Sequence, residues 1–137
     1  VPTLALPSSG WHRGAIGIVA AKLVEAFHRP AIVISIDGYV AHGSCRSIPS
    51  FNMLGALESC GELMTKFGGH KQAAGLTLES RNIRELRARV NDHADSRIGP
   101  DDLRPRLCID GALAFRGMSE QVVAELPSLA PVGAGAP

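Results

Sequence analysis

Residues 31–38 read Ala-Ile-Val-Ile-Ser-Ile-Asp-Gly, which is the strongest strand signal in the chain. The run is rich in β-branched residues, and its closing Asp-Gly pair favours a turn. A short apolar run of this kind is typical of a strand that lies inside a sheet. The stretch therefore predicts a buried strand over 31–36, followed by a chain reversal.

Elements on either side of this strand follow from the same kind of pattern. Upstream, apolar residues recur at the spacing of one helix face, and this helix is expected to end before Pro30. The residues are Ile16, Val19, Leu23 and Phe27. Downstream, a second strand is predicted over 40–48, and Pro49 stops it.

The middle of the chain predicts one helix and one strand. Asn52 offers an N-cap for a helix whose apolar positions extend over 53–64. Gly61 weakens the middle of this helix, and the Phe-Gly-Gly sequence at 67–69 is expected to break it. Loose alternation then predicts a strand over 73–79.

The C-terminal part begins with a clear helical stripe. Asn82 and Glu85 resemble a capping box at its start. The apolar stripe consists of Ile83, Leu86, Val90 and Ala94. A further strand is predicted over 107–115, and Ser119 is expected to cap a last short helix that continues through Leu126.

This alternation of helices and strands predicts an α/β or α+β fold, with one central mixed β-sheet flanked by helices in a single domain. The 137 residues are 45% hydrophobic and 20% charged, which suits a globular domain with its own core. We expect the domain to occupy 1–128. The Gly- and Pro-rich residues 129–137 are expected to begin a linker within a longer polypeptide.

Composition restricts the functional classes. The formal net charge is +1, so any phosphate-binding surface has to be local. With one Trp, one Tyr and four Phe, the chain lacks an aromatic stripe on which successive bases could stack. The three cysteines are widely spaced and no leader-like segment opens the sequence, so we expect reduced thiols in a cytoplasmic protein. No apolar run approaches the ~20 residues of a membrane helix.

Three short motifs are candidates for phosphate binding. Gly68-Gly69-His70-Lys71 combines exposed backbone N–H groups with two side-chain donors, although a chain reversal with two solvated polar residues is the more common explanation of this motif taken alone. Arg46, within Gly43-Ser-Cys-Arg-Ser47, offers a planar fork for phosphate, or is one exposed Arg on a strand edge. Trp11-His12 precedes a helix start, where His12 can help to bind an anion while Trp11 can instead be a hydrophobic plug.

Metal and nucleotide motifs are not found in the sequence. There is no HExxH spacing, no cysteine pair that completes a zinc site and no GxxxxGK[ST] loop. The Asp92-His93 pair lies within a predicted helix and is interpreted as a solvated face. Asp101-Asp102 has no third ligand nearby, so the sequence predicts no metal site in this chain.

Four segments in this order resemble the DHH-associated domain of the RecJ family of single-strand DNA exonucleases. They are 10–23 (GWHRGAIGIVAAKL), 43–48 (GSCRSI), 67–75 (FGGHKQAAG) and the tail 129–137 (LAPVGAGAP). The resemblance covers residues 10–137. Many related domains have a third glycine at the position that Phe67 occupies here.

The resemblance implies a division of labour between two lobes that face each other across a groove for one DNA strand. The first lobe carries the Asp and His ligands of two Mn²⁺ or Mg²⁺ ions, and the second lobe, which this chain resembles, holds the phosphates. The implied phosphate-binding residues are Arg46, Ser47, Gly68, Gly69, His70 and Lys71, and Trp11 and His12 are implied to line the face toward the first lobe. Among them, His70 is the candidate for stabilising the transition state.

The expected function is therefore the binding of single-stranded DNA phosphates within a metal-dependent 5′-end exonuclease of DNA repair and recombination. The parent protein is expected to be a hydrolase, whereas this chain alone is expected to be inactive, without a metal or a small-molecule cofactor. Its partners are expected to be single-stranded DNA and the catalytic lobe of the same polypeptide, and not a membrane. Two alternatives are the corresponding domain of an oligonucleotide or dinucleotide phosphoesterase of the same superfamily, and an RNA-binding accessory domain like that of alanyl-tRNA synthetase.

Overall fold

The computed structural model describes residues 2–109 and 111–130 of the chain. These residues belong to two compact units, Val1–Pro105 and Arg106–Pro137. Each unit has its own internal contacts, and the candidate site lies in the first. Among the described residues, none of the helices combines the length and the apolar character that crossing a bilayer requires.

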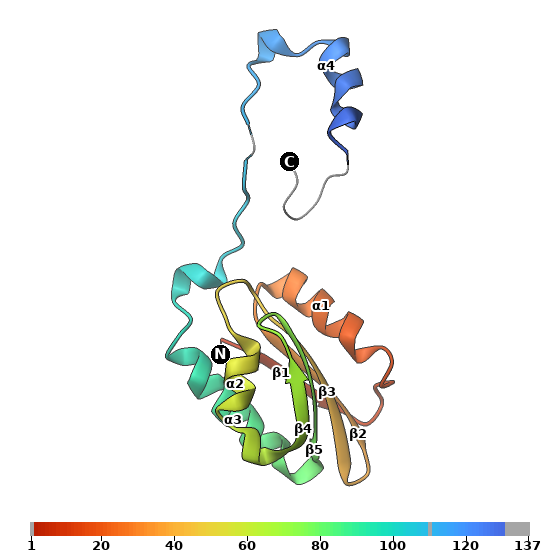
Figure 1. Ribbon diagram of the computed structural model, residues 1–137, viewed down its shortest axis with the longest axis vertical. Helices are drawn as coiled ribbons and strands as arrows, with labels where there is room; N and C mark the ends of the chain where they lie inside the picture. Colours follow the sequence, from red (N-terminus) through yellow and green to blue (C-terminus); the bar gives the residue numbers. More distant parts are fainter. Residues whose placement is uncertain (1, 110, 131–137) are drawn as a thin grey trace. The chain divides into compact units, whose positions relative to one another are not determined.

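One five-stranded mixed sheet forms the centre of the first unit (Figure 1). Its strands are β1 (Leu4–Ser8), β2 (Ala31–Asp37), β3 (Val40–Arg46), β4 (Met64–Gly69) and β5 (Ala73–Glu79). They lie side by side in the order β1-β2-β3-β5-β4. β1 is parallel to β2, and the other neighbours are antiparallel. The α+β class with a mixed sheet, which the sequence predicts, is confirmed.

Helices cover the sheet on both faces (Figure 1). They are α1 (Ile16–Phe27) on one face, and α2 (Met53–Glu58) and α3 (Ile83–Asp95) on the other. Val33 of β2 packs under α1 against Ile16, whereas Ile32 and Ile34 point into the larger core with Leu86 of α3. Successive side chains of β2 thus pack into two cores on opposite faces of the sheet, which is why nearly every residue of this strand is apolar.

Short 3₁₀ turns connect these elements. In the first unit they are Gly61–Leu63, Ser80–Asn82 and Pro100–Leu103. The second unit contains α4 (Glu120–Glu125) and the 3₁₀ turns Phe115–Gly117 and Leu126–Leu129. The hydroxyl of Ser119 accepts a hydrogen bond of 3.2 Å from the Val122 N–H, so the predicted cap of this helix is confirmed.

Several predicted elements are confirmed because their signals are local. The helix before Pro30 and the strands predicted over 31–36, 40–48 and 73–79 correspond to α1, β2, β3 and β5. The predicted stripe on α3 is buried at all four positions: Ile83, Leu86, Val90 and Ala94.

The helix predicted over 53–64 is wrong in its second half. α2 ends at Glu58, and the chain from Met64 to Gly69 is strand β4, so the Phe-Gly-Gly sequence does not break a helix but ends a strand. Pairing with β5 satisfies the backbone of this segment, and two glycines, Gly55 and Gly61, make a long helix here unfavourable. Tertiary pairing therefore outweighs the helical spacing of the apolar residues.

Two further predictions are wrong. The described residues of 107–115 form no strand, and Leu107 and Ile109 are exposed instead of lying in a sheet. Asn82 does precede α3 but forms no capping box, since its backbone is helical and its amide donates to the Leu63 carbonyl at 3.0 Å. The sequence also did not predict β1, whose Pro7 is tolerated because β1 is an edge strand.

The predicted domain boundary between 128 and 129 stays a prediction and falls within the second unit. Of the predicted linker, residues 131–137 lie outside the described residues.

Candidate functional site

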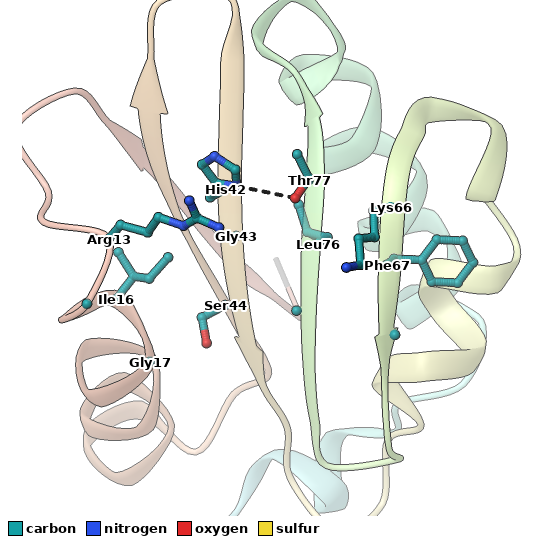
Figure 2. Close-up of a pocket in the computed structure, with 13 residues that line it drawn as sticks. Arg13, Ile16, Gly17, His42, Gly43, Ser44, Lys66, Phe67, Leu76 and Thr77 are labelled. Atoms are coloured by element: carbon teal, nitrogen blue, oxygen red, sulfur yellow. Dashed lines mark hydrogen bonds between the residues drawn. The ribbon is translucent and has the colours of Figure 1, made fainter.

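A groove of about 630 Å³ lies on the α1 side of the sheet, over β3, β5 and β4 (Figure 2). α1 packs against β2 and β3, and the groove opens beside it. The volume is that of an ordinary ligand site. Its lining residues are Arg13, Gly14, Ile16, Gly17, His42, Gly43, Ser44, Lys66, Phe67, Gly68, Gly75, Leu76 and Thr77. No Asp or Glu occurs in this described lining, so the groove favours an anionic ligand.

Strand register decides which side chains face the groove. His42, Ser44 and Arg46 alternate along β3 with the buried Ala41 and Cys45, and therefore share the groove side of the strand. In the antiparallel ladders, His42 pairs with Thr77 and Ser44 with Gly75.

A β-bulge brings Lys66 onto this face. The register of β4 against β5 shifts between Met64 and Lys66, so Lys66 pairs with Thr77 and Phe67 with Leu76. Without the extra residue, Thr65 would occupy the groove position and Lys66 would point into the core. In Figure 2 the Phe67 ring points away from the groove, and this ring packs against the larger core.

The floor of the groove is bare backbone at Gly68 and Gly75. These two glycines pair across β4 and β5. A Cβ on Gly68 would meet no atom within 4 Å, and one on Gly75 would meet only the Gly43 carbonyl oxygen at 3.8 Å. Packing within the chain therefore does not require glycine at either position, and the missing side chains leave room for a ligand to approach the main chain.

Gly69 has a different role from its neighbour. Its φ of +147° is one that L side chains rarely adopt, and an added Cβ would lie 2.5 Å from the Ala74 Cα and press on the Ala73 carbonyl. The His70 N–H donates to that Ala73 carbonyl at 2.8 Å and closes the β4–β5 turn. Of the two consecutive glycines, the fold thus requires Gly69, whereas no packing within the chain requires Gly68, which a ligand can approach.

Arg46 is connected to the groove by a hydrogen bond to Ser44, which lines it. Its Nη1 donates to the Ser44 hydroxyl at 3.3 Å and to the Cys45 carbonyl at 2.9 Å. A Cβ on Gly17 of α1 would lie 3.3 Å from Ser44 Oγ and 3.5 Å from Arg46 Nη2, so this glycine lets the helix approach both groups. Arg46 itself is not a lining residue, but its guanidinium lies beside two that are, Ser44 and Gly17.

Ser47, His70 and Lys71 lie outside the groove lining. Ser47 is buried, and its hydroxyl donates to the Phe51 carbonyl at 2.9 Å. The side chains of His70 and Lys71 are exposed in the β4–β5 turn, where the Lys71 carbonyl accepts from the Met53 N–H at 2.9 Å. Ser47 therefore already has a structural hydrogen bond, whereas His70 and Lys71 are accessible.

Trp11 and His12 shape the loop that leads into α1. Trp11 packs against the small core beneath α1, and its carbonyl accepts from the Ser35 hydroxyl at 2.6 Å. The Nδ1 atom of His12 accepts from the Gly14 N–H at 3.1 Å. Both residues hold the loop in a shape that carries Arg13, which Figure 2 shows extending toward β3.

Among the described lining residues, Gly68 is the one that was a sequence candidate. The polar side chains of the lining that the candidates did not include are Arg13, His42, Ser44, Lys66 and Thr77. Alternation along β3 could have identified His42, since it is two residues from Ser44. No sequence signal reveals the bulge that turns Lys66 toward the groove, because β4 was predicted to be helical.

The other reactive groups are unsuited to chemistry in the groove. Burial raises the pKa of the Cys45 thiol to about 12, which keeps it protonated. His93 packs edge-on against Phe51, with ring centroids 6.0 Å apart, and its pKa is lowered by burial and by the nearby Arg97. In the described part of the chain, no three His, Cys, Asp or Glu side chains gather into a group that could hold a metal ion. The described residues of this chain therefore do not fit the two Mn²⁺ or Mg²⁺ ions, which the resemblance to RecJ assigns to the first lobe.

Comparison with known proteins identifies the family and the fold. The DHHA1 domain model matches residues 1–95. The single-stranded-DNA-specific exonuclease RecJ of Bacillus subtilis is 39% identical over 132 residues, which are 95% of this chain but 17% of that protein. RecJ from Thermus thermophilus, in a crystal structure with Mg²⁺, superposes with a TM-score of 0.85 at 32% identity, covering 99% of this chain and 21% of that one.

A more distant likeness extends to another class of protein. The C-Ala domain of Aquifex aeolicus alanyl-tRNA synthetase matches with a TM-score of 0.53 at 10% identity, over 64% of this chain and 88% of that domain. At this identity the match shows a shared fold alone. The chain belongs to the DHHA1 domain family, and in sequence and fold it resembles the RecJ proteins over nearly its whole length.

Proposed function

We propose that this chain is the substrate-binding domain of a longer, RecJ-type exonuclease, and that its groove holds phosphates of single-stranded DNA. The observation that carries the proposal is the groove itself. It joins cationic and hydroxyl side chains to a floor of bare backbone at Gly68 and Gly75, and its described lining contains no carboxylate. Such a surface neutralises a phosphodiester and lets its oxygens approach the main chain.

The primary phosphate position in this proposal lies at Ser44 and Arg46. The Arg46 guanidinium is already oriented by the Cys45 carbonyl and the Ser44 hydroxyl. Pre-oriented donors bind an anion at a smaller entropic cost than free side chains. The exposed His70 at the β4–β5 turn is proposed to contact the substrate from the rim, with Lys71 beside it.

This domain contributes position and charge, while the bond cleavage is proposed to take place on another lobe of the same polypeptide. RecJ from Thermus thermophilus has been solved in complex with Mg²⁺ and with Mn²⁺, and these structures support a divalent metal ion as the cofactor for cleavage in the longer protein. In this proposal, the chain holds the DNA strand so that a phosphodiester faces those metals. This positioning lowers the entropic part of the barrier to cleavage, although the chain supplies no nucleophile. Roles in DNA repair and recombination, and a location in the cytoplasm, are part of the same proposal.

The test uses the full-length polypeptide that contains this chain and measures its Mn²⁺-dependent degradation of a single-stranded oligonucleotide. We expect Arg46→Ala and Ser44→Ala to raise KM at least about tenfold, because each removes a phosphate contact. Lys22→Ala is the matched control, since Lys22 is exposed on α1 and pairs with Glu25 at 2.8 Å. Normal degradation by Arg46→Ala and Ser44→Ala, with folding intact, would contradict the proposal.

A further inference from the structure

We propose that His42, Thr77 and Lys66 form a second anion subsite, which holds the next phosphate of the same strand. These three residues are called the His42 row. The inference rests on the proposed function, because it takes the position at Ser44 and Arg46 as the first phosphate site.

The His42 row runs across three strands in register. His42 of β3 pairs with Thr77 of β5, and Thr77 pairs with Lys66 of β4. The His42 Nδ1 and Thr77 Oγ1 atoms are hydrogen-bonded at 3.2 Å, as the dashed line in Figure 2 marks. All three residues line the groove, so the row offers a hydroxyl, a ring nitrogen and an ammonium group to one ligand.

The charge around the row favours an anion. Arg13 lines the same groove from the loop before α1. Within the part of the chain that the structure describes, neither Arg13 nor Lys66 forms a salt bridge. The next residue of β5 on this face is Glu79, and its carboxylate is paired with Arg81 at 2.8 Å. Two cations thus remain available to a ligand at this end of the groove.

The spacing of the two subsites suits a nucleic-acid backbone. Ser44 and His42 are two residues apart on one strand, which separates their rows by about 6.6–6.8 Å. Successive phosphates of an extended single strand are separated by a similar distance. Ser44 pairs with Gly75, and Gly75 pairs with Gly68, so the bare backbone of the groove floor lies in the same row as the first subsite. A DNA strand can therefore lie close to the main chain as it passes from one subsite to the other. An isolated phosphate would need only one of these rows.

The test compares two probes with one and two phosphates, thymidine 5′-monophosphate and 5′-phosphorylated dithymidylate, which differ by one nucleotide. Their affinities for the 137-residue chain are measured by NMR titration, with the amide signals of Gly68 and Gly75 as local reporters. Signal dispersion in the same spectra shows whether each variant is folded. Lys66→Gln accompanies Lys66→Ala as a milder change, and Lys22→Ala is the control at an exposed lysine outside the groove.

We expect Lys66→Ala and His42→Ala to weaken dinucleotide binding about fivefold, and mononucleotide binding less than about twofold. Arg46→Ala is expected to weaken both probes. For the dinucleotide, Lys66→Ala is also expected to reduce the slope of log affinity against log salt by about 0.7, the value for one lost phosphate contact on a single strand.

Other outcomes separate the two proposals. Equal losses for both probes, or no loss for either, in Lys66→Ala and His42→Ala overturn the second subsite, even when Arg46→Ala supports the first. Normal binding of both probes by Arg46→Ala counts against the first phosphate site instead. If neither probe shifts the Gly68 and Gly75 signals of the unmutated chain, both proposals are wrong.

Discussion

Gly68 of β4 lies directly opposite Gly75 of β5, and neither glycine is required by the packing of the chain around it. Elsewhere in a sheet, paired glycines weaken a ladder because they bury no side chain. Here they leave a strip of exposed backbone at the bottom of a groove that is lined by cations. Packing within the chain thus does not account for the glycine pair, and we interpret it as part of the proposed binding surface.

Gly68→Val is expected to keep the fold and lose the ligand. A valine Cβ meets no atom within 4 Å at this position, and valine suits a strand, so the free energy of unfolding should change by less than about 1 kcal/mol. Its methyl groups would occupy the groove floor and reduce affinity for single-stranded DNA at least about tenfold. Fluorescence anisotropy of a labelled oligonucleotide with the full-length polypeptide measures this loss. Gly111→Val is the matched control, because its Cβ is equally unobstructed and lies outside the groove.

Gly69→Ala is expected to behave in the opposite way. The φ of +147° and the contact of a Cβ with the Ala73 carbonyl force the β4–β5 turn to rearrange. We expect a loss of about 3 kcal/mol or more in the free energy of unfolding. Urea denaturation of the 137-residue chain, followed by circular dichroism, provides the measurement. A stability equal to that of the parent chain would show that the turn tolerates a side chain, and that Gly69 too is free for a ligand.

The buried Cys45 predicts a stability that falls in alkaline solution. Its folded-state pKa is raised by burial from 9.0 to about 12, so the unfolded thiol loses its proton first as pH rises. Between about pH 9 and 12 the native state holds more protons than the unfolded state, and stability decreases by up to about 1.4 kcal/mol per pH unit from this group. Below pH 9 the contribution of Cys45 is fully retained.

Comparison of the parent chain with Cys45→Ala, by urea denaturation at several pH values from 8 upward, isolates this effect. The variant should show a shallower loss of stability, because other groups titrate equally in both proteins. Parallel pH profiles for the two proteins would mean that Cys45 ionises as readily in the folded chain as in the unfolded one.

The chain by itself is expected to be inactive as a nuclease. In the proposed division of labour, the metal ions that activate water belong to another lobe of the longer polypeptide. The described residues of this chain bring together no three His, Cys, Asp or Glu side chains that could hold such an ion. Incubation of the 137-residue chain with Mn²⁺ and a labelled single-stranded oligonucleotide should leave the oligonucleotide intact. The full-length polypeptide serves as the positive control. Degradation by this chain alone, after removal of contaminating nucleases, would refute the division of labour proposed here.

The sequence by itself determined those elements whose signals are local. The apolar run of β2 and the stripes of α1 and α3 depend on residues one to four positions apart, so no knowledge of the fold is needed to predict them. The segment around Arg46 and the glycine pair at 68–69 were also singled out from the sequence as candidates. Each has a plain structural explanation when taken alone, and the order of the segments along the chain made them candidates through the resemblance to RecJ. Two of these candidates, Gly68 and Arg46, are now connected to the groove by the observed contacts.

Only the tertiary structure decided how these parts form a site. β4 is a strand because β5 lies beside it, and the bulge near Thr65 turns Lys66 toward the groove and Phe67 toward the core. Hydrogen bonding between strands depends on partners far along the chain, and a shift of one residue exchanges the two faces of a strand. For the same reason the sequence could not separate Gly68, which a ligand can approach, from Gly69, which the turn requires.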